Sequence, residues 1–321
     1  GSWGVGNFVD YFRDPRFVTI TSRSLLLAFS ATVITIVLAF GYAYALIRTF
    51  IPLKSLWRFC ALLPIFAPSL VQALGIQFLL GRNGLISNLL DIRIDIYGFW
   101  GILLSDMLYA FPHAVLIIIT ALSVADGRLY EAGRMLGASE FRLFWTVTLP
   151  ASRYGIMSAA FVVFTIVITD FGNAMVIGGD YSVLATEIYN QVSGQANFRL
   201  GAVIGIVLLV PAGLAMLVER QVARRNTAIL SERSSPLTLR KHPLRDAFAF
   251  TYVIVISTII LSVAGIVVVA SFVKLWPYNI SFTLDHYVTD VQNGYAPLWT
   301  SLGMAAITAL LGTVLVTLNA Y

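Results

Sequence analysis

Two aspartates stand inside long apolar runs, where an ionisable side chain is costly unless protein or water surrounds it. Asp170 has Asn173 about one helical turn further on, and Asp106 lies in another run, two turns before His113. Such residues can line a pathway for a polar solute, or they can hydrogen-bond to a neighbouring helix. We therefore take Asp170, Asn173 and Asp106 as candidate pathway residues, with helix packing as the alternative.

The other reactive side chains form no pattern that would support a reaction. None of the lysines, Lys54, Lys241 and Lys274, stands in the Gly-x-x-x-x-Gly-Lys-Ser/Thr context of a phosphate-binding loop. The three histidines are scattered and Cys60 is the only cysteine, so the spacing of a metal site does not occur. We expect a chain that is not an enzyme and that holds no cofactor and no metal ion.

The composition is that of a membrane protein. Of 321 residues, 58% are hydrophobic and only 12% are charged, against roughly 25% charged residues in soluble domains. Runs of about 20 apolar residues match the roughly 30 Å hydrocarbon core of a bilayer. We predict an all-α, multi-pass helix bundle with seven spans, at residues 24–47, 59–80, 99–122, 156–177, 200–217, 247–273 and 300–319.

Basic residues indicate which loops face the cytoplasm. If 48–58 is cytoplasmic, so are 123–155 and 218–246, and these loops hold 14 of the 21 lysines and arginines. Positive charge favours the cytoplasmic side, so the N-terminus is predicted outside and Tyr321 near the cytoplasm. The net charge of +5 then reflects topology and anionic lipid, which argues against nucleic acid as a partner. Residues 1–17 are amphipathic and read as an approach to the first span.

Prolines interrupt several of these runs. Pro64, Pro68, Pro112 and Pro211 each remove a backbone hydrogen bond and predict kinks, either in a packed bundle or beside a pathway. The span at 200–217 is the weakest, because it is short and contains Pro211. If 200–217 were not a span, the predicted membrane orientation of every later segment would be reversed.

The loop at 123–155 is long and polar, and it is built as two short helical segments around a glycine. Residues 129–136 favour a helix, Gly137 permits a sharp turn, and residues 141–149 resume an apolar helical periodicity that Pro150 is expected to end. A helix, turn and helix of this kind presents a rigid knob to a cytoplasmic partner. An amphipathic loop helix lying in the membrane interface is the alternative.

This loop resembles the signature of the permeases of binding-protein-dependent ABC importers, which reads Glu-Ala-Ala, three residues, Gly, nine residues, Ile, one residue, Leu-Pro. Two positions depart from it, with glycine in place of the second alanine and valine in place of isoleucine. The matching residues are Glu131, Ala132, Gly133, Gly137, Val147, Leu149 and Pro150.

The resemblance implies a MetI-like permease fold in the inner membrane of a bacterium. It implies an ATP-binding ABC subunit, present as a dimer on the cytoplasmic side, and a periplasmic or extracellular substrate-binding protein on the other side. The loop would be a coupling helix seated in a groove of the ATPase, with Gly137, Ala138 and Ser139 at its tip and Glu131 making polar contacts. ATPase closure would then move two permease lobes between inward-facing and outward-facing states.

We predict that the chain divides into a first lobe at 1–217, a basic linker at 218–246 and the truncated beginning of a second lobe at 247–321. Six identities between residues 24–44 and 301–321 hint at a tandem duplication. This layout resembles the permeases of ferric-iron and 2-aminoethylphosphonate importers, and the stretches 167–179 and 183–198 resemble the phosphonate type.

The resemblance leaves the cargo and the mechanism open. We expect a small anion or an organophosphonate such as 2-aminoethylphosphonate as the cargo, with ferric iron as the alternative. A different class, the ion-coupled secondary transporter, should show paired broken helices or several buried charges. Outside the spans, residues 178–199 are the best candidate for docking a substrate-binding protein, with an aromatic belt at the headgroups as the alternative.

Overall fold

The computed structural model describes residues 6–92, 94–123, 127–228, 241–288 and 294–320. The chain forms two compact units, Gly1–Val267 and Val268–Tyr321. The first unit includes most of the helix that follows residues 218–246. The interval 218–246 is helical at both ends, and residues 229–240 lie outside the described residues.

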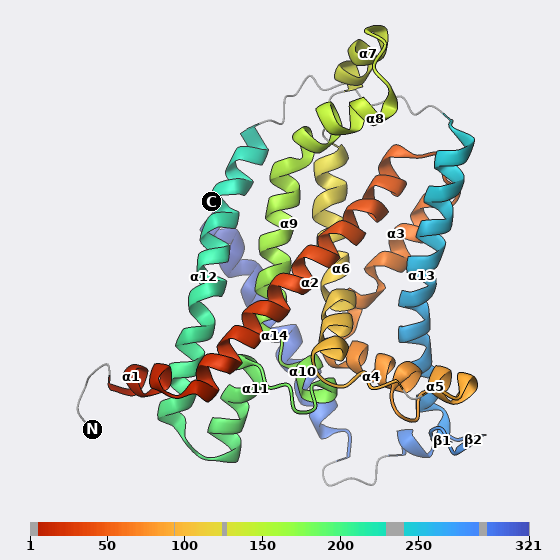
Figure 1. The fold of residues 1–321 in the computed structure, drawn as a ribbon. Coiled ribbons are helices and arrows are strands. Elements are labelled where there is room, and N and C mark those ends of the chain that lie inside the picture. The colour runs from red at the N-terminus through yellow and green to blue at the C-terminus, as the bar shows by residue number, and fades with distance from the viewer. Residues whose placement is uncertain (1–5, 93, 124–126, 229–240, 289–293, 321) are drawn as a thin grey trace. The chain divides into compact units, whose positions relative to one another are not determined.

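Long helices make up the first unit, and each corresponds to an apolar run of the sequence (Figure 1). Within the described residues of the whole chain, six helices are long and apolar enough to cross a membrane, or seven if one bent pair counts as a span. This agrees with the predicted all-α bundle of about seven spans. The long helices of the first unit are α2 (Pro15–Arg48), α6 (Phe99–Ser123), α9 (Leu149–Thr169), α12 (Phe198–Ala228) and α13 (Pro243–Ser271).

Small side chains allow the helices of this bundle to approach closely. The buried face of α2 is rich in alanine, including Ala28, Ala31 and Ala39, and it packs against α6 and α9. Tyr42 of α2 is fully buried and connects several elements through its hydroxyl group, which donates to Trp57 O at 2.7 Å and lies 2.8 Å from Ser257 Oγ of α13. These contacts attach α13 to the first unit.

The span predicted at 59–80 is sharply bent near Pro64 and Pro68, two of the positions at which the sequence predicts kinks. The structure has α3 (Lys54–Leu62), a 3-10 turn η1 (Leu63–Phe66) and α4 (Ser69–Leu80), and the chain bends by 105° between Lys54–Phe66 and Ser69–Leu90. Pro68 has no N–H to continue a helix, and the residue before a proline is driven into extended backbone, as Ala67 is at φ −118° and ψ 142°. A short helix α5 (Leu85–Leu90) follows.

The span expected at 156–177 is also broken. Helix α9 begins earlier, at Leu149, and ends at Thr169, and a separate short helix α10 (Gly172–Ile177) follows after Asp170 and Phe171. In contrast, the span expected to be weakest, 200–217, lies within the 31-residue helix α12, which continues through Pro211. Pro112 is likewise inside α6.

Pro150 does not end a helix, which corrects the expectation for residues 141–150. The short helix α8 (Glu140–Leu143) runs into a π-helical turn η2 (Phe144–Thr148) and then into α9, where Pro150 occupies the first turn. The Leu149 N–H bonds to Phe144 O, five residues back. A proline is tolerated in a first helical turn, since its missing N–H would have no regular partner there.

Shorter elements lie at the two ends of the first unit. Helices α7 (Gly127–Met135) and α8 lie at the end where α2 and α12 finish and α13 begins (Figure 1). Helix α1 (Gly6–Arg13), as expected a separate approach to the first long helix, lies at the opposite end with α11 (Leu184–Tyr189) and a π-helical turn η3 (Asn190–Gly194).

The second unit contains strands that the sequence analysis did not anticipate. Strands β1 (Val273–Leu275) and β2 (Asn279–Phe282) pair antiparallel, with Val273 opposite Phe282. A 3-10 turn η4 (Asp285–Tyr287) and helix α14 (Ala296–Ala320) follow. The strands are too short for a periodic pattern to reveal them in the sequence.

Candidate functional site: the coupling knob and the polar core

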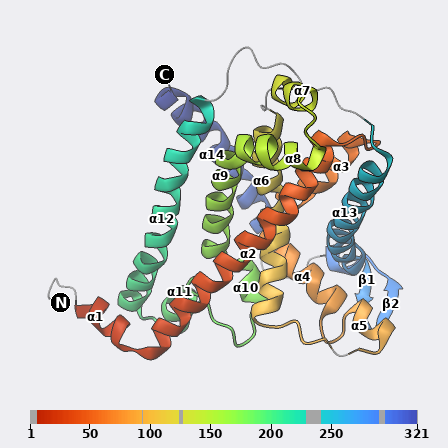
Figure 2. The same ribbon diagram turned by 45° about the horizontal axis from the view of Figure 1, so that its top comes forward.

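Helices α7 and α8 form the knob that the sequence predicts (Figure 2). Gly137 lies in the turn between them. Gly137 has φ +77°, a left-handed conformation that favours glycine. Its N–H donates to Arg134 O at 2.9 Å, and the Ala138 N–H donates to Gly133 O at 2.9 Å, a pattern that closes the end of a helix. Ser139 then begins α8, because its Oγ accepts from Arg142 N. The residues expected at the tip thus form a defined turn.

The surface of this knob is apolar at its tip, which the sequence analysis missed. Met135, Leu136 and Phe141 are largely exposed. Glu131 and Ala132 are also exposed, and Glu131 makes no ion pair with any residue that the structure describes. Neighbouring exposed apolar side chains are typical of a protein contact. Their position beside Gly137 in a polar loop was the signal in the sequence.

Gly133, a departure from the family signature, is explained by its packing. A Cβ at this position would lie 2.5 Å from Cδ2 of Leu143, a buried residue of α8. The absence of a side chain at 133 therefore lets α8 fold closely onto α7. A second tie between the two helices is the ion pair from Arg134 Nε to Glu140 Oε1 at 2.9 Å.

The knob is fixed to the long helices through Tyr130. Its hydroxyl group lies 2.8 Å from Thr148 Oγ1 in the π-helical turn before α9. The guanidinium group of Arg48, at the end of α2, lies over the Tyr130 ring with Cζ 4.8 Å from the centroid. The same guanidinium donates to Leu122 O near the end of α6 at 2.8 Å. Movement of α7 is thereby tied to three long helices.

Three signature residues lie away from the tip. Val147 is in the π-helical turn, and Leu149 and Pro150 open α9. Val147 and Leu149 are half-buried, whereas Pro150 is exposed. These residues therefore shape the junction between the knob and the membrane span, and the tip itself is left to residues 135–139.

The three candidate pathway residues come together in the interior of the first unit. Asp170 Oδ2 accepts from the Asn173 N–H at 2.9 Å, and Asn173 Nδ2 donates to Asp106 Oδ1 at 2.7 Å. Asp106 is 1% exposed and Asn173 is 0% exposed. Asp106 Oδ2 and Asn173 Oδ1 have no hydrogen-bond partner among the described residues. His113, two turns from Asp106, is not part of this cluster and packs against the Tyr109 ring.

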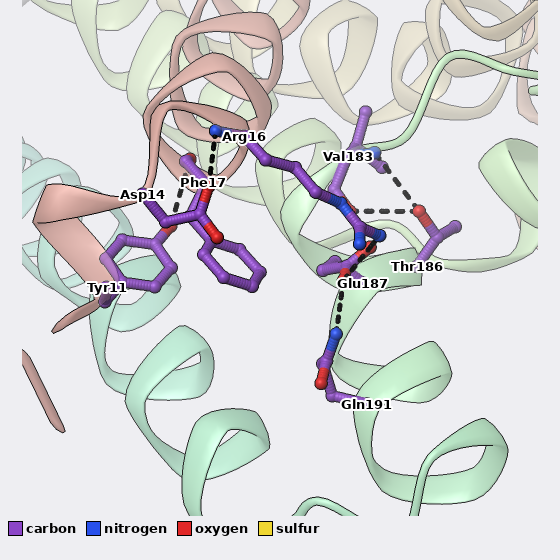
Figure 3. A network of polar contacts seen from close by, with 8 residues as sticks. All are labelled: Tyr11, Asp14, Arg16, Phe17, Val183, Thr186, Glu187 and Gln191. Atoms are coloured by element: carbon purple, nitrogen blue, oxygen red, sulfur yellow. Dashed lines mark hydrogen bonds and ion pairs between the residues drawn. The ribbon is translucent and has the colours of Figure 1, made fainter.

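A further polar cluster, not predicted from the sequence, lies at the end of the unit opposite the knob (Figure 3). Glu187 of α11 is 0% exposed, and its carboxylate forms an ion pair with Arg16 of α2 at 3.2 Å, while the Arg16 side chain is 57% exposed. Gln191 Nε2 also donates to Glu187 Oε1 at 2.7 Å. This cluster holds α11 against the start of α2. Because 171 residues separate Arg16 from Glu187, no local pattern indicates the pair.

Among the residues that the structure describes, no three His, Cys, Asp or Glu side chains are grouped so that they could hold a metal ion. The candidate functional features of the described chain are thus the exposed knob, the buried cluster of Asp106, Asn173 and Asp170, and the cluster of Arg16, Glu187 and Gln191. None of them has the geometry of a catalytic centre with a nucleophile and its base.

Residues 31–227 match the family described as the binding-protein-dependent transport system inner membrane component. The chain belongs to this family, since the match covers more than half of its length. It is therefore a multi-pass inner-membrane protein with the permease fold.

The relatives include two ferric transport system permease proteins named FbpB. The one from Actinobacillus pleuropneumoniae is 27% identical over 317 residues, covering 92% of this chain and 46% of the relative. The one from Haemophilus influenzae is 26% identical, covering 89% and 47%. The molybdenum transport system permease protein ModB of Escherichia coli K12 is 27% identical and covers 66% of this chain and 95% of its own length. The chain thus spans about half the length of the ferric relatives.

A solved bacterial alginate ABC transporter, in complex with a periplasmic protein bound to an alginate pentasaccharide, has a similar fold. The TM-score is 0.59 at 18% identity, and the match covers 70% of this chain and 84% of that chain. This likeness supports the permease fold alone.

The packing of Gly133 predicts a coupled effect of two substitutions. Gly133→Ala should force the Leu143 side chain to shift and loosen α8 from α7, at a net cost of up to about 1 kcal/mol, because the gain in helix propensity offsets part of the overpacking. Hydrogen exchange of the backbone at 130–143 should accelerate. The effect of Gly133→Ala should be smaller when Leu143→Ala has already made room.

Gly194→Ala is the control for this pair, since no atom lies within 4 Å of a Cβ at that position. It should leave exchange in the knob unchanged. Equal effects of Gly133→Ala with and without Leu143→Ala would contradict the packing interpretation.

The Asp106–Asn173 pair predicts different outcomes for two substitutions of Asp106. Asn at position 106 brings an amide N–H that can donate to Asn173 Oδ1, so Asp106→Asn should be tolerated. Asp106→Ala should destabilise the unit by about 1–3 kcal/mol, because it leaves the buried Asn173 amide without its partner. Thermal unfolding in detergent measures both, with the exposed Asp10→Ala as a control that should change little. A larger loss from Asp106→Asn than from Asp106→Ala would overturn this account.

Proposed function

We propose that this chain provides one lobe, and the beginning of another, of the permease of an ATP-driven importer. Residues 1–217 would form the first lobe, 218–246 the connection and 247–321 the start of the second. The observation that carries the proposal is the knob, which exposes apolar residues at its tip while Tyr130 ties its base to the ends of α2, α6 and α9.

The knob has the properties needed to receive force from another protein. Its tip is a short turn at Gly137, where a backbone can approach a partner closely, and Met135, Leu136 and Phe141 offer apolar contact area around it. Glu131 is exposed nearby and can fix the register of docking by charge. The partner would be the ATP-binding subunit, as a dimer on the cytoplasmic side.

The opposite end offers a platform for a soluble partner. The ion pair of Arg16 with Glu187 and the hydrogen bond from Leu184 N to Ser24 Oγ hold the segment 178–199 against α2. Within this segment residues 183–187 are buried, whereas residues 189–190 and 193–199 are exposed and mostly polar. An exposed polar surface on an anchored segment suits docking of a substrate-binding protein. We assign the docking surface to this segment, as the sequence suggested.

The polar cluster of Asp106, Asn173 and Asp170 is our candidate for a gate on the substrate pathway. It sits where the fourth span breaks, and Asn173 and Asp106 join α10 to α6 by a single side-chain hydrogen bond at 2.7 Å. One bond of this kind can be exchanged for bonds to water or cargo when the helices separate. The cluster is closed in this structure, because Asp106 and Asn173 are buried.

The bent second span and the broken fourth span are also features expected of an ion-coupled secondary transporter. The cluster of Asp106, Asn173 and Asp170 contains two acidic side chains among the described residues. A knob with an apolar tip has no role in ion coupling. Family membership and the knob therefore favour the ATP-driven importer.

Two cargoes are supported to different degrees. The ferric permease relatives match 92% and 89% of this chain, beyond the linker and into the proposed second lobe. The sulfate and molybdenum permease relatives cover 64–70% and 66% of it. We propose ferric iron as the first candidate and a small anion or an organophosphonate such as 2-aminoethylphosphonate as the second.

Association with the ATPase should depend on the tip of the knob. Leu136 is 87% exposed, and Leu136→Glu should reduce co-purification of the ATPase about tenfold or more, by placing a charge in an apolar contact. Gly137→Val should do the same, because a β-branched residue resists φ +77°. Membrane insertion should be normal in both variants.

The matched control is Leu89→Glu, since Leu89 is 80% exposed and lies in α5 at the other end of the unit. It should leave co-purification unchanged. Undiminished ATPase association of Leu136→Glu and Gly137→Val would count against the coupling role.

Uptake by the complete transporter, reconstituted with its ATPase and binding protein, should distinguish the cargoes. We expect ATP-dependent accumulation of ferric iron and no accumulation of 2-aminoethylphosphonate, and the reverse result would select the second candidate. Uptake of either compound on an ion gradient without ATP would instead show a secondary transporter.

A further inference from the structure

A polar pocket of about 610 Å³ opens at the end of the first unit that carries α11. Its volume is within the range of small-molecule sites. One wall comes from α2, a second from the segments that follow α4 and precede α6, and a third from the segment after α10. The side chains used below are Arg23, Arg82, Asp95, Tyr97, Asp180 and Tyr181.

Two arginines of the pocket are held by tyrosine rings. Arg23 Cζ lies 5.0 Å from the centroid of the Tyr181 ring, and Arg82 Cζ lies 5.2 Å from that of Tyr97. A guanidinium that lies over a ring keeps its N–H groups free to bind an oxyanion through two hydrogen bonds. Neither arginine forms an ion pair with a carboxylate in the part of the chain that the structure describes.

The loops that carry the tyrosines are fixed against each other. The Gly98 N–H donates to Ile177 O at 2.9 Å, and the Tyr181 hydroxyl donates to Arg23 O at 3.3 Å. Gly98 and Gly179 have φ of +93° and +51°, and a Cβ on Gly179 would lie 3.5 Å from Tyr97 Cβ. The pocket is therefore formed in advance of any ligand, which lowers the entropic cost of binding.

Two carboxylates share the pocket with the arginines. Asp95 and Asp180 are exposed, and neither is paired with a basic side chain within the described residues. A ligand with only negative charge would be attracted by the arginines and repelled by the aspartates, and a cation would meet the opposite balance. A ligand with an oxyanion at one end and an ammonium group at the other complements all four charges.

We propose that this pocket binds a small zwitterion, with its oxyanion on Arg23 and Arg82 and its ammonium group at Asp95 and Asp180. The ligand is either a soluble compound or the phosphate and amine of a phosphatidylethanolamine headgroup, which share this chemistry. The proposal concerns a binding site at the mouth of the bundle and does not depend on which cargo crosses the membrane.

Calorimetric titration of the full chain in a non-ionic maltoside detergent, which carries neither charge of the proposed ligand, tests the charge requirement. The probe is 2-aminoethylphosphonate, compared with ethylphosphonate, which lacks the amine, and ethylamine, which lacks the oxyanion. We expect each one-ended analogue to bind about tenfold more weakly than the probe, the loss expected for one charge-assisted contact of about 1.4 kcal/mol.

Substitutions test the residues. Arg82→Ala should weaken binding of the probe about tenfold, and Asp180→Asn should weaken the probe while leaving ethylphosphonate unchanged or tighter. Arg13→Ala is the matched control, because Arg13 is exposed at the same end of the unit and lies outside both the pocket and the segment 178–199. Thermal unfolding shows whether each variant is folded, and Arg23→Lys, which keeps a charge, is a milder second variant.

Competition with a short-chain phosphatidylethanolamine distinguishes the two sources. If the lipid occupies half of the sites at a lower concentration than soluble 2-aminoethylphosphonate does, the ligand is a lipid headgroup. If it needs a higher concentration, the ligand is a soluble compound. Equal binding of the probe and both analogues, or an unchanged affinity of folded Arg82→Ala and Arg23→Lys, overturns the proposal. Binding only of an acidic partner protein would overturn it as well. ATPase association, measured on the same variants, reports separately on the proposed function, because the knob lies at the other end of the unit.

Discussion

A helix in a bilayer can stop only where protein, and not lipid, surrounds the backbone groups that the break sets free. In the first unit this constraint brings two breaks together. The second span breaks before α4 and the fourth before α10, and a Cβ on Gly172 of α10 would lie 2.4 Å from Ser69 Oγ of α4. Each break is covered by the other. The absence of a side chain at Gly172 is what allows this approach.

The polar cluster is a consequence of the same breaks. When α9 ends at Thr169, the N–H groups at the start of α10 lose their helical partners, and Asp170 supplies an acceptor to Asn173 N. The Asn173 side chain then finds its partner in Asp106 on α6. The hydrogen bonds of these residues therefore hold helices together, and this packing role is compatible with a position on the substrate pathway. A contact that closes a break is also a place where the bundle can reopen.

Features that depend on neighbouring residues could be predicted from the sequence. The turn at Gly137 and the apolar runs of the long helices follow from local spacing and length, and the structure contains both. The proline at Pro68 predicts a kink, and the structure has a 105° bend there. The break at Asp170 was missed, because a window of about 20 residues averages one polar position into an apolar run. Glu187 could not be assigned a partner, since Arg16 is adjacent only in the folded chain. The tip residues Met135 and Leu136 became recognisable once their exposure was known.

The attachment of the knob decides how a push on it would be transmitted. Arg48 is buried although it is charged, and its guanidinium is held between the Tyr130 ring and the Leu122 carbonyl at the end of α6. A cation at a helix C-terminus is favoured by the helix dipole, and separating it from both partners would leave a buried charge uncompensated, which costs several kcal/mol. A displacement of α7 is therefore less costly if α2, α6 and α9 move with it than if the knob tilts alone. In the proposed coupling role, the knob would move as part of the bundle, and a force applied at Gly137 would reach the break at Asp170 along the continuous helix α9.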